Sequence, residues 1–137
     1  MEGMDVSPDG KQIWAANAQQ GTISIIDVAS TTTRALDAGV TGANRLKFTP
    51  DGKLVLVSTL AGPNLTIINP LDYTSEPKRI PVGRGAAGIQ IQPDGLRAYI
   101  ACSPDDYVAV VDLKSFQVVG RIDAGKNPDG LAWAVTH

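Results

Sequence analysis

A Pro-Asp-Gly tripeptide recurs through this chain, and its spacing constrains the fold more than any other feature of the sequence. The copies occupy residues 8–10, 50–52 and 93–95. Successive glycines of the tripeptide lie 42 and then 43 residues apart. A self-similar segment of this length indicates a repeat protein, in which each repeat is one supersecondary unit that packs against its neighbours.

The alignment of the copies extends well beyond the tripeptide. From each of these glycines it runs without a gap for seventeen residues. Aligned positions include Trp14, Leu56 and Tyr99, and further along Asp27, Asn69 and Asp112. A later glycine closes each copy, at Gly39, Gly83 and Gly125. Its spacing of 44 and then 42 residues places a two-residue insertion in the second copy, near residues 75–77.

A fourth copy begins near the end of the chain and stops early. Residues 130–135 align with residues 3–8 and 88–93, which open the first and third copies. Residues 128–130 also spell Pro-Asp-Gly, but they are out of register with the repeat and therefore belong to the preceding loop.

Four short segments rich in Val, Ile and Thr make up each copy, with Gly, Pro, Asn and Asp between them. In the first copy they are residues 4–6, 12–17, 22–27 and 33–37. This composition predicts strands, and no longer stretch has apolar side chains at helical spacing. Four strands per repeat of this length form one blade of a β-propeller. The sequence therefore predicts an all-β propeller arc of three four-stranded antiparallel blades, at 3–43, 44–86 and 87–129, plus an extra first strand at 130–137.

Each residue of the tripeptide has a role in the hairpin between strands one and two. Pro fixes φ at the second turn position, the Asp carboxylate accepts the backbone N–H two residues on, and Gly adopts the left-handed conformation. Asp27, Asn69 and Asp112 are expected to end the third strand and to cap the turn that follows it.

The repeat resembles a known family. Residues 14–17 (Trp-Ala-Ala-Asn) and 99–102 (Tyr-Ile-Ala-Cys) stand where the YVTN family of β-propeller repeats has Tyr-Val-Thr-Asn. Ser-Pro-Asp-Gly-Lys precedes the first of them, and Gly-Thr-Ile-Ser-Ile-Ile-Asp follows it. The resemblance covers essentially the whole chain in three copies. The second copy departs from it, with Leu-Val-Ser-Thr at residues 56–59 and Asn69 in place of Asp.

The resemblance implies a propeller of about seven blades in a periplasmic, secreted or cell-surface protein of bacteria or archaea. Family members are often scaffolds or binding proteins. Similar blades occur in lactonase-like enzymes and in quinone-linked amine dehydrogenases. The repeat motif itself supplies no catalytic residue that could be transferred to this chain.

Three blades cannot close a ring, because propellers close with about four to eight blades. An open arc would expose apolar flanks at both ends. The sequence leaves three arrangements open: the C-terminal part of a longer propeller, a six-bladed ring of two chains, or a monomeric arc. The extra first strand favours the first, because in a closed propeller a lone C-terminal strand completes the blade begun at the N-terminus. The second is disfavoured, because two chains would bring eight first strands to a ring of six blades.

Composition excludes several classes of site and partner. A net charge of −2 gives no electrostatic basis for binding nucleic acid. A single cysteine and a single histidine, His137, exclude a disulfide framework, a Cys-rich zinc site and a multi-histidine metal site. No apolar run approaches the ~20 residues of a membrane span, and residues 1–20 lack a signal-peptide core. No metal or cofactor is expected.

The first strands supply candidates for the central channel. Two apolar positions recur in them and are expected to pack between blades: Met4, Leu46, Ile89 and Leu131, and Val6, Phe48, Ile91 and Trp133. Between them lie Asp5, Lys47 and Gln90, which differ in charge and are expected to face the channel.

Loops at one end of the arc supply the other candidates. Inter-blade loops and the loops between strands two and three are expected to share one rim, because strands alternate in direction. Arg84, Asp105, Asp106 and Asp129 are the charged candidates there. Residues 83–88 match the dinucleotide motif Gly-x-Gly-x-x-Gly, but a strand is expected to follow in place of the helix that this motif requires.

These observations predict a non-enzymatic binding or scaffold module whose partner, a protein or a small ligand, binds these channel and rim residues. The rest of its own propeller, or a second copy, is the partner expected to close the ring. The alternative is an enzyme of the lactonase-like or quinone-linked amine dehydrogenase type, with an active site completed by other blades. For such a site the chain offers Asp5, Lys47, Arg84 and Asp105.

Overall fold

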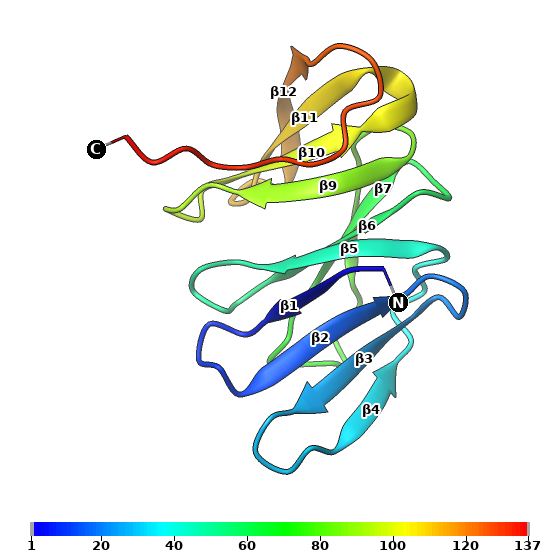
Figure 1. The fold of residues 1–137 in the computed structure, drawn as a ribbon, viewed down its shortest axis with the longest axis vertical. Coiled ribbons are helices and arrows are strands. Elements are labelled where there is room, and N and C mark those ends of the chain that lie inside the picture. Colours follow the sequence, from blue (N-terminus) through cyan, green and yellow to red (C-terminus); the bar gives the residue numbers. More distant parts are fainter. Residues whose placement is uncertain (1, 137) are drawn as a thin grey trace.

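The computed structural model of the protein describes residues 2–136, which form three separate four-stranded antiparallel sheets (Figure 1). The first contains β1 (Met4–Val6), β2 (Gln12–Asn17), β3 (Thr22–Asp27) and β4 (Thr33–Leu36). The second contains β5 (Ala43–Phe48), β6 (Val55–Thr59), β7 (Asn64–Ile68) and β8 (Lys78–Pro81). The third contains β9 (Ala86–Ile91), β10 (Arg97–Cys102), β11 (Tyr107–Asp112) and β12 (Gln117–Asp123). Strands pair in chain order, so each sequence repeat forms one sheet.

The first strands of the three sheets, β1, β5 and β9, lie side by side (Figure 1). The remaining strands of each sheet extend away from them, as the blades of a propeller extend from its axis. The prediction of an all-β propeller arc is confirmed. A short 3-10 turn, η1 (Ser103–Asp105), is the one helical element in residues 2–136, and no helix there has the length and apolar content to span a membrane.

The Pro-Asp-Gly hairpins have the predicted geometry. In the first, the carbonyl of Ser7 accepts the N–H of Gly10 at 2.8 Å, and the carboxylate of Asp9 accepts the N–H of Lys11 at 2.9 Å. Gly10 has φ +74°, in the left-handed region. Equivalent bonds recur around Asp51 and Asp94. The predicted caps are also present, since the side chains of Asp27, Asn69 and Asp112 each accept a backbone N–H of the following turn.

Acid should destabilise the fold through these turns. The hydroxyl of Ser7 lowers the pKa of Asp9, and the hydroxyl of Thr49 lowers the pKa of Asp51. A folded-state pKa below the unfolded value adds stability above the unfolded pKa, and this stability is lost as pH falls through the folded pKa. We therefore expect urea unfolding to show a loss of stability between about pH 5 and about pH 2. The variant Asp51→Asn should lose less over this range. Stability that is constant, or that rises on acidification, would contradict the expectation.

Two apolar layers join the three sheets. Between the first and second sheets, Trp14 is fully buried and meets Phe48 edge to face, with ring centroids 5.5 Å apart. Tyr73, in the β7–β8 loop, also contacts Trp14, at 5.9 Å between centroids. This loop also contains the predicted insertion, and through Tyr73 the loop contributes to the first layer. Between the second and third sheets, Leu56, Ile80 and Ile100 belong to a second buried cluster.

The first-strand positions that were expected to pack between blades do so only inside the arc. Leu46, Phe48, Ile89 and Ile91 are buried. The prediction is wrong for Met4 and Val6, which are 58% and 49% exposed. Each pairs with a β2 residue whose side chain lies on the face of the first sheet opposite Trp14. Because Trp14 faces the second sheet, Met4 and Val6 point away from that sheet. Within residues 2–136, no other sheet covers the face on which they lie.

The prediction of an extra strand at residues 130–137 is also wrong for the described part of that segment. Residues 130–136 form no strand, and His137 lies outside the described residues. A first strand pairs with the second strand of its own blade, and within residues 2–136 no strand pairs with this segment. The segment nevertheless lies along β9, with Trp133 against Tyr99 at 5.9 Å between ring centroids. Phe48 and Trp14, at the repeat positions equivalent to Trp133 and Tyr99, also contact each other. Residues 130–136 therefore lie where the first strand of a following blade would lie.

Candidate functional site

Six loops meet at one end of the arc, as predicted, and we call this surface the loop rim. Three connect β2 to β3, β6 to β7 and β10 to β11 (residues 18–21, 60–63 and 103–106), and three follow the fourth strands (residues 37–42, 82–85 and 124–129). Hydroxyl groups join the two sets: Thr59 donates to the carbonyl of Thr41, and Ser103 donates to the carbonyl of Pro128. The first of these bonds joins loops of the first and second blades, and the second joins two loops of the third blade.

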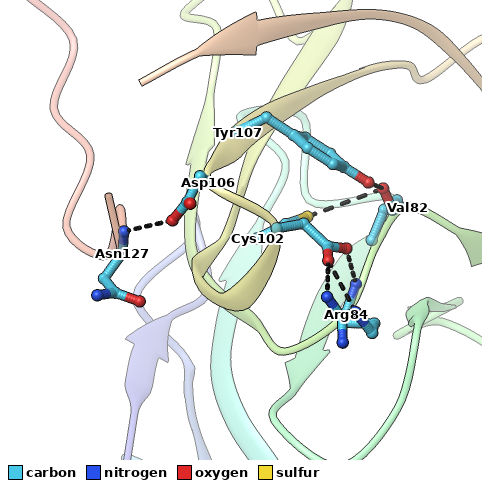
Figure 2. Close-up of polar contacts among 7 residues, drawn as sticks. Val82, Arg84, Cys102, Asp106, Tyr107 and Asn127 are labelled. Atoms are coloured by element: carbon cyan, nitrogen blue, oxygen red, sulfur yellow. Dashed lines mark hydrogen bonds and ion pairs between the residues drawn. The ribbon is translucent and has the colours of Figure 1, made fainter. Parts of the chain in front are cut away.

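An ion pair fastens the junction between the second and third sheets (Figure 2). The guanidinium of Arg84 lies 2.7 Å from the carboxylate of Asp105, which also accepts the backbone N–H of Arg84 at 2.8 Å. These hydrogen bonds lower the pKa of Asp105. The side chain of Arg84 is 73% exposed and that of Asp105 is 18% exposed. Arg84 is thus a surface cation that already has a carboxylate partner.

The other acidic rim candidates do not converge on Asp105. Asp106 has φ +60° and accepts the N–H of Asn127 at 2.9 Å, so it serves the loop that follows β12 (Figure 2). Asp129 lies in the C-terminal segment, where its carbonyl borders Gly88. Among residues 2–136 no three His, Cys, Asp or Glu side chains are grouped so that they could hold a metal ion.

A buried thiol and a phenol lie beneath the same junction. The hydroxyl of Tyr107 donates to the carbonyl of Val82 at 2.8 Å, and the thiol of Cys102 makes a longer contact to it at 3.8 Å (Figure 2). Burial raises the pKa of Tyr107, and it raises the pKa of Cys102 to about 11. Because the thiolate is the reactive form of cysteine, Cys102 is a packing residue and not a nucleophile at neutral pH.

Alkylation should show how inert this thiol is. At about pH 8, a thiol of pKa 11 holds about one hundredth of the thiolate of a thiol at the ordinary 9.0, and burial blocks access further. Iodoacetamide should therefore modify Cys102 at least about 100-fold more slowly in the folded protein than in urea. Equal rates in the two states, followed by mass spectrometry, would contradict both the burial and the raised pKa.

The channel candidates are only partly brought together. The ammonium of Lys47 lies 3.9 Å from the carboxylate of Asp5, whose other oxygen accepts the N–H of Phe48 at 2.9 Å. Lys47 lines a hollow of about 390 Å³ beside the first strands, together with Arg45 and Glu2. Gln90 lies apart, in a different hollow with Tyr99. Asp5 thus ties the first sheet to the second.

A groove at the junction between the first and second sheets was not predicted from the sequence. It has a volume of about 360 Å³ and lies among loop and strand residues, including Gly39, Thr41, Thr59, Gly62, Asn64 and Arg79. Arg79 reaches it from β8. Aligning the fourth strands would have shown arginine at this position in two copies, Arg79 and Arg121, and Ala35 in the other. The insertion in the second copy lies just before this strand and obscures the alignment.

Residues 83–88 lead directly into β9 and not into a helix, as expected. Gly83 has φ +147°, and a Cβ there would lie 2.2 Å from the hydroxyl of Tyr107. The motif's first glycine is therefore explained by close packing within the junction, and the helix N-terminus that would hold a pyrophosphate is absent from this loop.

Comparisons with known proteins support the fold. No family model and no curated protein matches the sequence. Hydrazine synthase of Kuenenia stuttgartiensis is similar in structure, with a TM-score of 0.86 at 23% identity over 93% of this chain and 37% of that one. A proposed 6-phosphogluconolactonase of Bacteroides uniformis has a TM-score of 0.74 at 24% identity, over 93% of this chain and 42% of that one. At such identities the likeness shows the β-propeller fold alone, and this chain spans less than half of either structure.

Proposed function

We propose that this chain is part of a binding or scaffold propeller that holds a small ligand or a protein on its loop rim without transforming it. The observation behind the proposal is that the rim is held in place from within. Arg84 and Asp105 pair across two loops, Asp106 and Ser103 both bind a third, and the hydroxyl of Thr59 fastens a fourth. Loops fixed in this way present a preformed surface, which lowers the entropic cost of binding.

The residues that would make the rim an enzyme site are committed to structure. Asp105 and Asp106 accept backbone N–H groups, and Cys102 has a raised pKa. A carboxylate whose pKa is held low, as at Asp105, is a weaker base, and a thiol whose pKa is raised, as at Cys102, leaves little thiolate to act as a nucleophile at neutral pH. This supports binding over catalysis for the part of the rim that the chain supplies.

A ligand panel with an NMR readout tests the proposal. Titration of the ¹⁵N-labelled chain with small acids, sugars and short peptides should shift amide signals of the six rim loops, while the ligand signals stay those of the intact compound. Shifts confined to the Pro-Asp-Gly turns, at the other end of the arc, would contradict the proposal. Conversion of a ligand would contradict it in favour of an enzyme.

A lactonase is the second candidate, because one of the similar structures is a proposed 6-phosphogluconolactonase. Incubating the chain with a phosphorylated sugar lactone should then accelerate ring opening beyond the spontaneous rate. The variants Asp5→Asn, Lys47→Met and Asp105→Asn should each be compared with the native chain, since these residues are the available acid, base and cation.

We further propose that the repeat belongs to the YVTN type, in an extracytoplasmic protein, and that further blades cover the exposed flanks. Met4 and Val6 at one end, and Val119 and Ile122 at the other, are about half exposed. Apolar strand faces of this kind are ordinarily covered. Light scattering tests whether a second copy of the chain or further blades of a longer chain cover these faces. A dimer that Val6→Lys dissociates would identify a second copy, and a monomer would favour blades of a longer chain.

A further inference from the structure

We propose that the groove around Arg79 binds an oxyanion, the carboxylate or phosphate group of a small molecule. The inference rests on the proposed binding function of the loop rim and names one site within it. The groove has a volume of about 360 Å³, which is in the range of small-molecule sites.

The guanidinium of Arg79 is held ready for such a ligand. One terminal nitrogen donates to the hydroxyl of Thr66 at 3.0 Å, and the other donates to the carbonyl of Ala38 at 3.1 Å. Thr66 is only 2% exposed, so it is a fixed acceptor. A guanidinium has five N–H donors, and these bonds use two of them. The remaining donors keep the fork geometry that matches a carboxylate or phosphate.

The charge of Arg79 is not neutralised by an ion pair. Residues 2–136 contain two ion pairs within 4.0 Å, Lys47 with Asp5 and Arg84 with Asp105. Asp37, in the loop beside Arg79, turns its carboxylate back to the N–H of Gly39 at 2.9 Å. The two junctions therefore differ: at one Asp105 supplies a carboxylate near Arg84 and Arg121, and at the other Gly62 occupies the equivalent repeat position in the groove.

The shape of the groove leaves the guanidinium accessible. A Cβ at Gly39 would lie 3.0 Å from a terminal nitrogen of Arg79, and Gly39 has φ +63°, so glycine fits both the space and the backbone. Asn64 and Thr41 line the same groove and add an amide and a hydroxyl group. Arg121 is the equivalent residue at the junction between the second and third sheets, where its guanidinium lies 4.8 Å from the ring centroid of Tyr107. It therefore serves as the matched control for Arg79.

Titration with inorganic phosphate and, separately, with acetate tests the proposal and distinguishes the two oxyanions. Amide signals of residues 39–41, 61, 62 and 64 should shift and saturate with one or both, at constant ionic strength. Arg79→Gln should weaken this binding about tenfold or more, and Arg121→Gln should leave it unchanged. Arg79→Lys keeps the charge but loses the fork, and should fall between the native chain and Arg79→Gln.

Several results would overturn the proposal. Shifts that do not saturate, or that sodium chloride reproduces, would mean that only the ionic atmosphere changes. Binding that Arg79→Gln retains at full strength would place the oxyanion elsewhere. If Arg79→Gln does not fold, the saturation measured on the native chain and the Arg79→Lys comparison decide the matter. Saturable shifts that are confined to residues 82–85, 103–106 or 124–129 would overturn the Arg79 site but leave the proposed rim function standing. A ligand panel that shifts no amide signal of the rim would overturn the rim function itself.

Discussion

Replacing Trp14 by alanine is expected to lower the free energy of unfolding by about 3–5 kcal/mol, the usual cost of emptying a buried aromatic site. Trp14 has no exposed surface, meets Phe48 and Tyr73 through its ring, and donates its indole N–H to Gln12 at 2.9 Å. The cavity would open between the first and second sheets, which are joined by this apolar layer. Urea unfolding followed by circular dichroism measures the loss.

Tyr99→Ala is the matched control, because Tyr99 occupies the same repeat position in the third sheet. Tyr99 is only partly buried and contacts Trp133, which is itself 42% exposed. Its removal should therefore cost clearly less, about 1–2 kcal/mol. Equal losses for the two variants would mean that the layer between the first two sheets contributes no more to stability than the contact with the C-terminal segment.

Gly83→Ala is expected to cost about 3 kcal/mol or more, through overpacking and backbone strain together. The new Cβ would lie 2.2 Å from the hydroxyl of Tyr107 and 2.9 Å from the sulfur of Cys102. Moving Tyr107 would break its hydrogen bond to Val82. The alanine would also have to adopt φ +147°, which residues with a side chain avoid.

The equivalent glycine of the third copy also has a positive φ but no close neighbour. Gly125 has φ +75°, and a Cβ there would meet nothing within 4 Å. Gly125→Ala therefore introduces backbone strain alone and should cost about 1 kcal/mol. Thermal unfolding of both variants measures the difference. A Gly83→Ala protein as stable as Gly125→Ala would show that Tyr107 and Cys102 move aside at little cost.

The sequence alone was sufficient to predict the features that repeat. Turn chemistry is local, so Pro-Asp-Gly predicts the φ of Gly10 and the bond from Lys11 to Asp9 without reference to the rest of the chain. The strand segments follow from composition in the same way. In the first copy the predicted segments agree with β1 to β4 except at residue 37, which lies beyond β4.

Features that depend on a neighbouring unit were not predictable in this way. Met4 and Leu46 are equivalent in the repeat, yet one is exposed and the other buried, because only Leu46 has a sheet on the side that it faces. The segment at 130–136 has the composition of a strand but pairs with no strand in residues 2–136.

The polar contacts of the candidate sites depend on side-chain direction across different sheets. The pairing of Arg84 with Asp105 spans 21 residues of sequence, and the bond from Phe48 to Asp5 spans 43. No periodicity within one copy indicates either contact. The open groove at Arg79 is harder still to predict, since it depends on a carboxylate being absent from one junction and present at the next.

The division into separate sheets has a consequence for how such a protein diversifies. No hydrogen-bonded ladder crosses from one sheet to another within residues 2–136, so apolar layers hold the blades together while the rim loops stand outside them. Recognition by exposed rim side chains such as Arg84 is therefore largely separate from the buried layers on which folding depends. A substitution at Arg79 or Arg84 changes the chemistry of one junction and leaves the layer beneath it intact. Each added blade brings a further junction that selection can alter independently of the others.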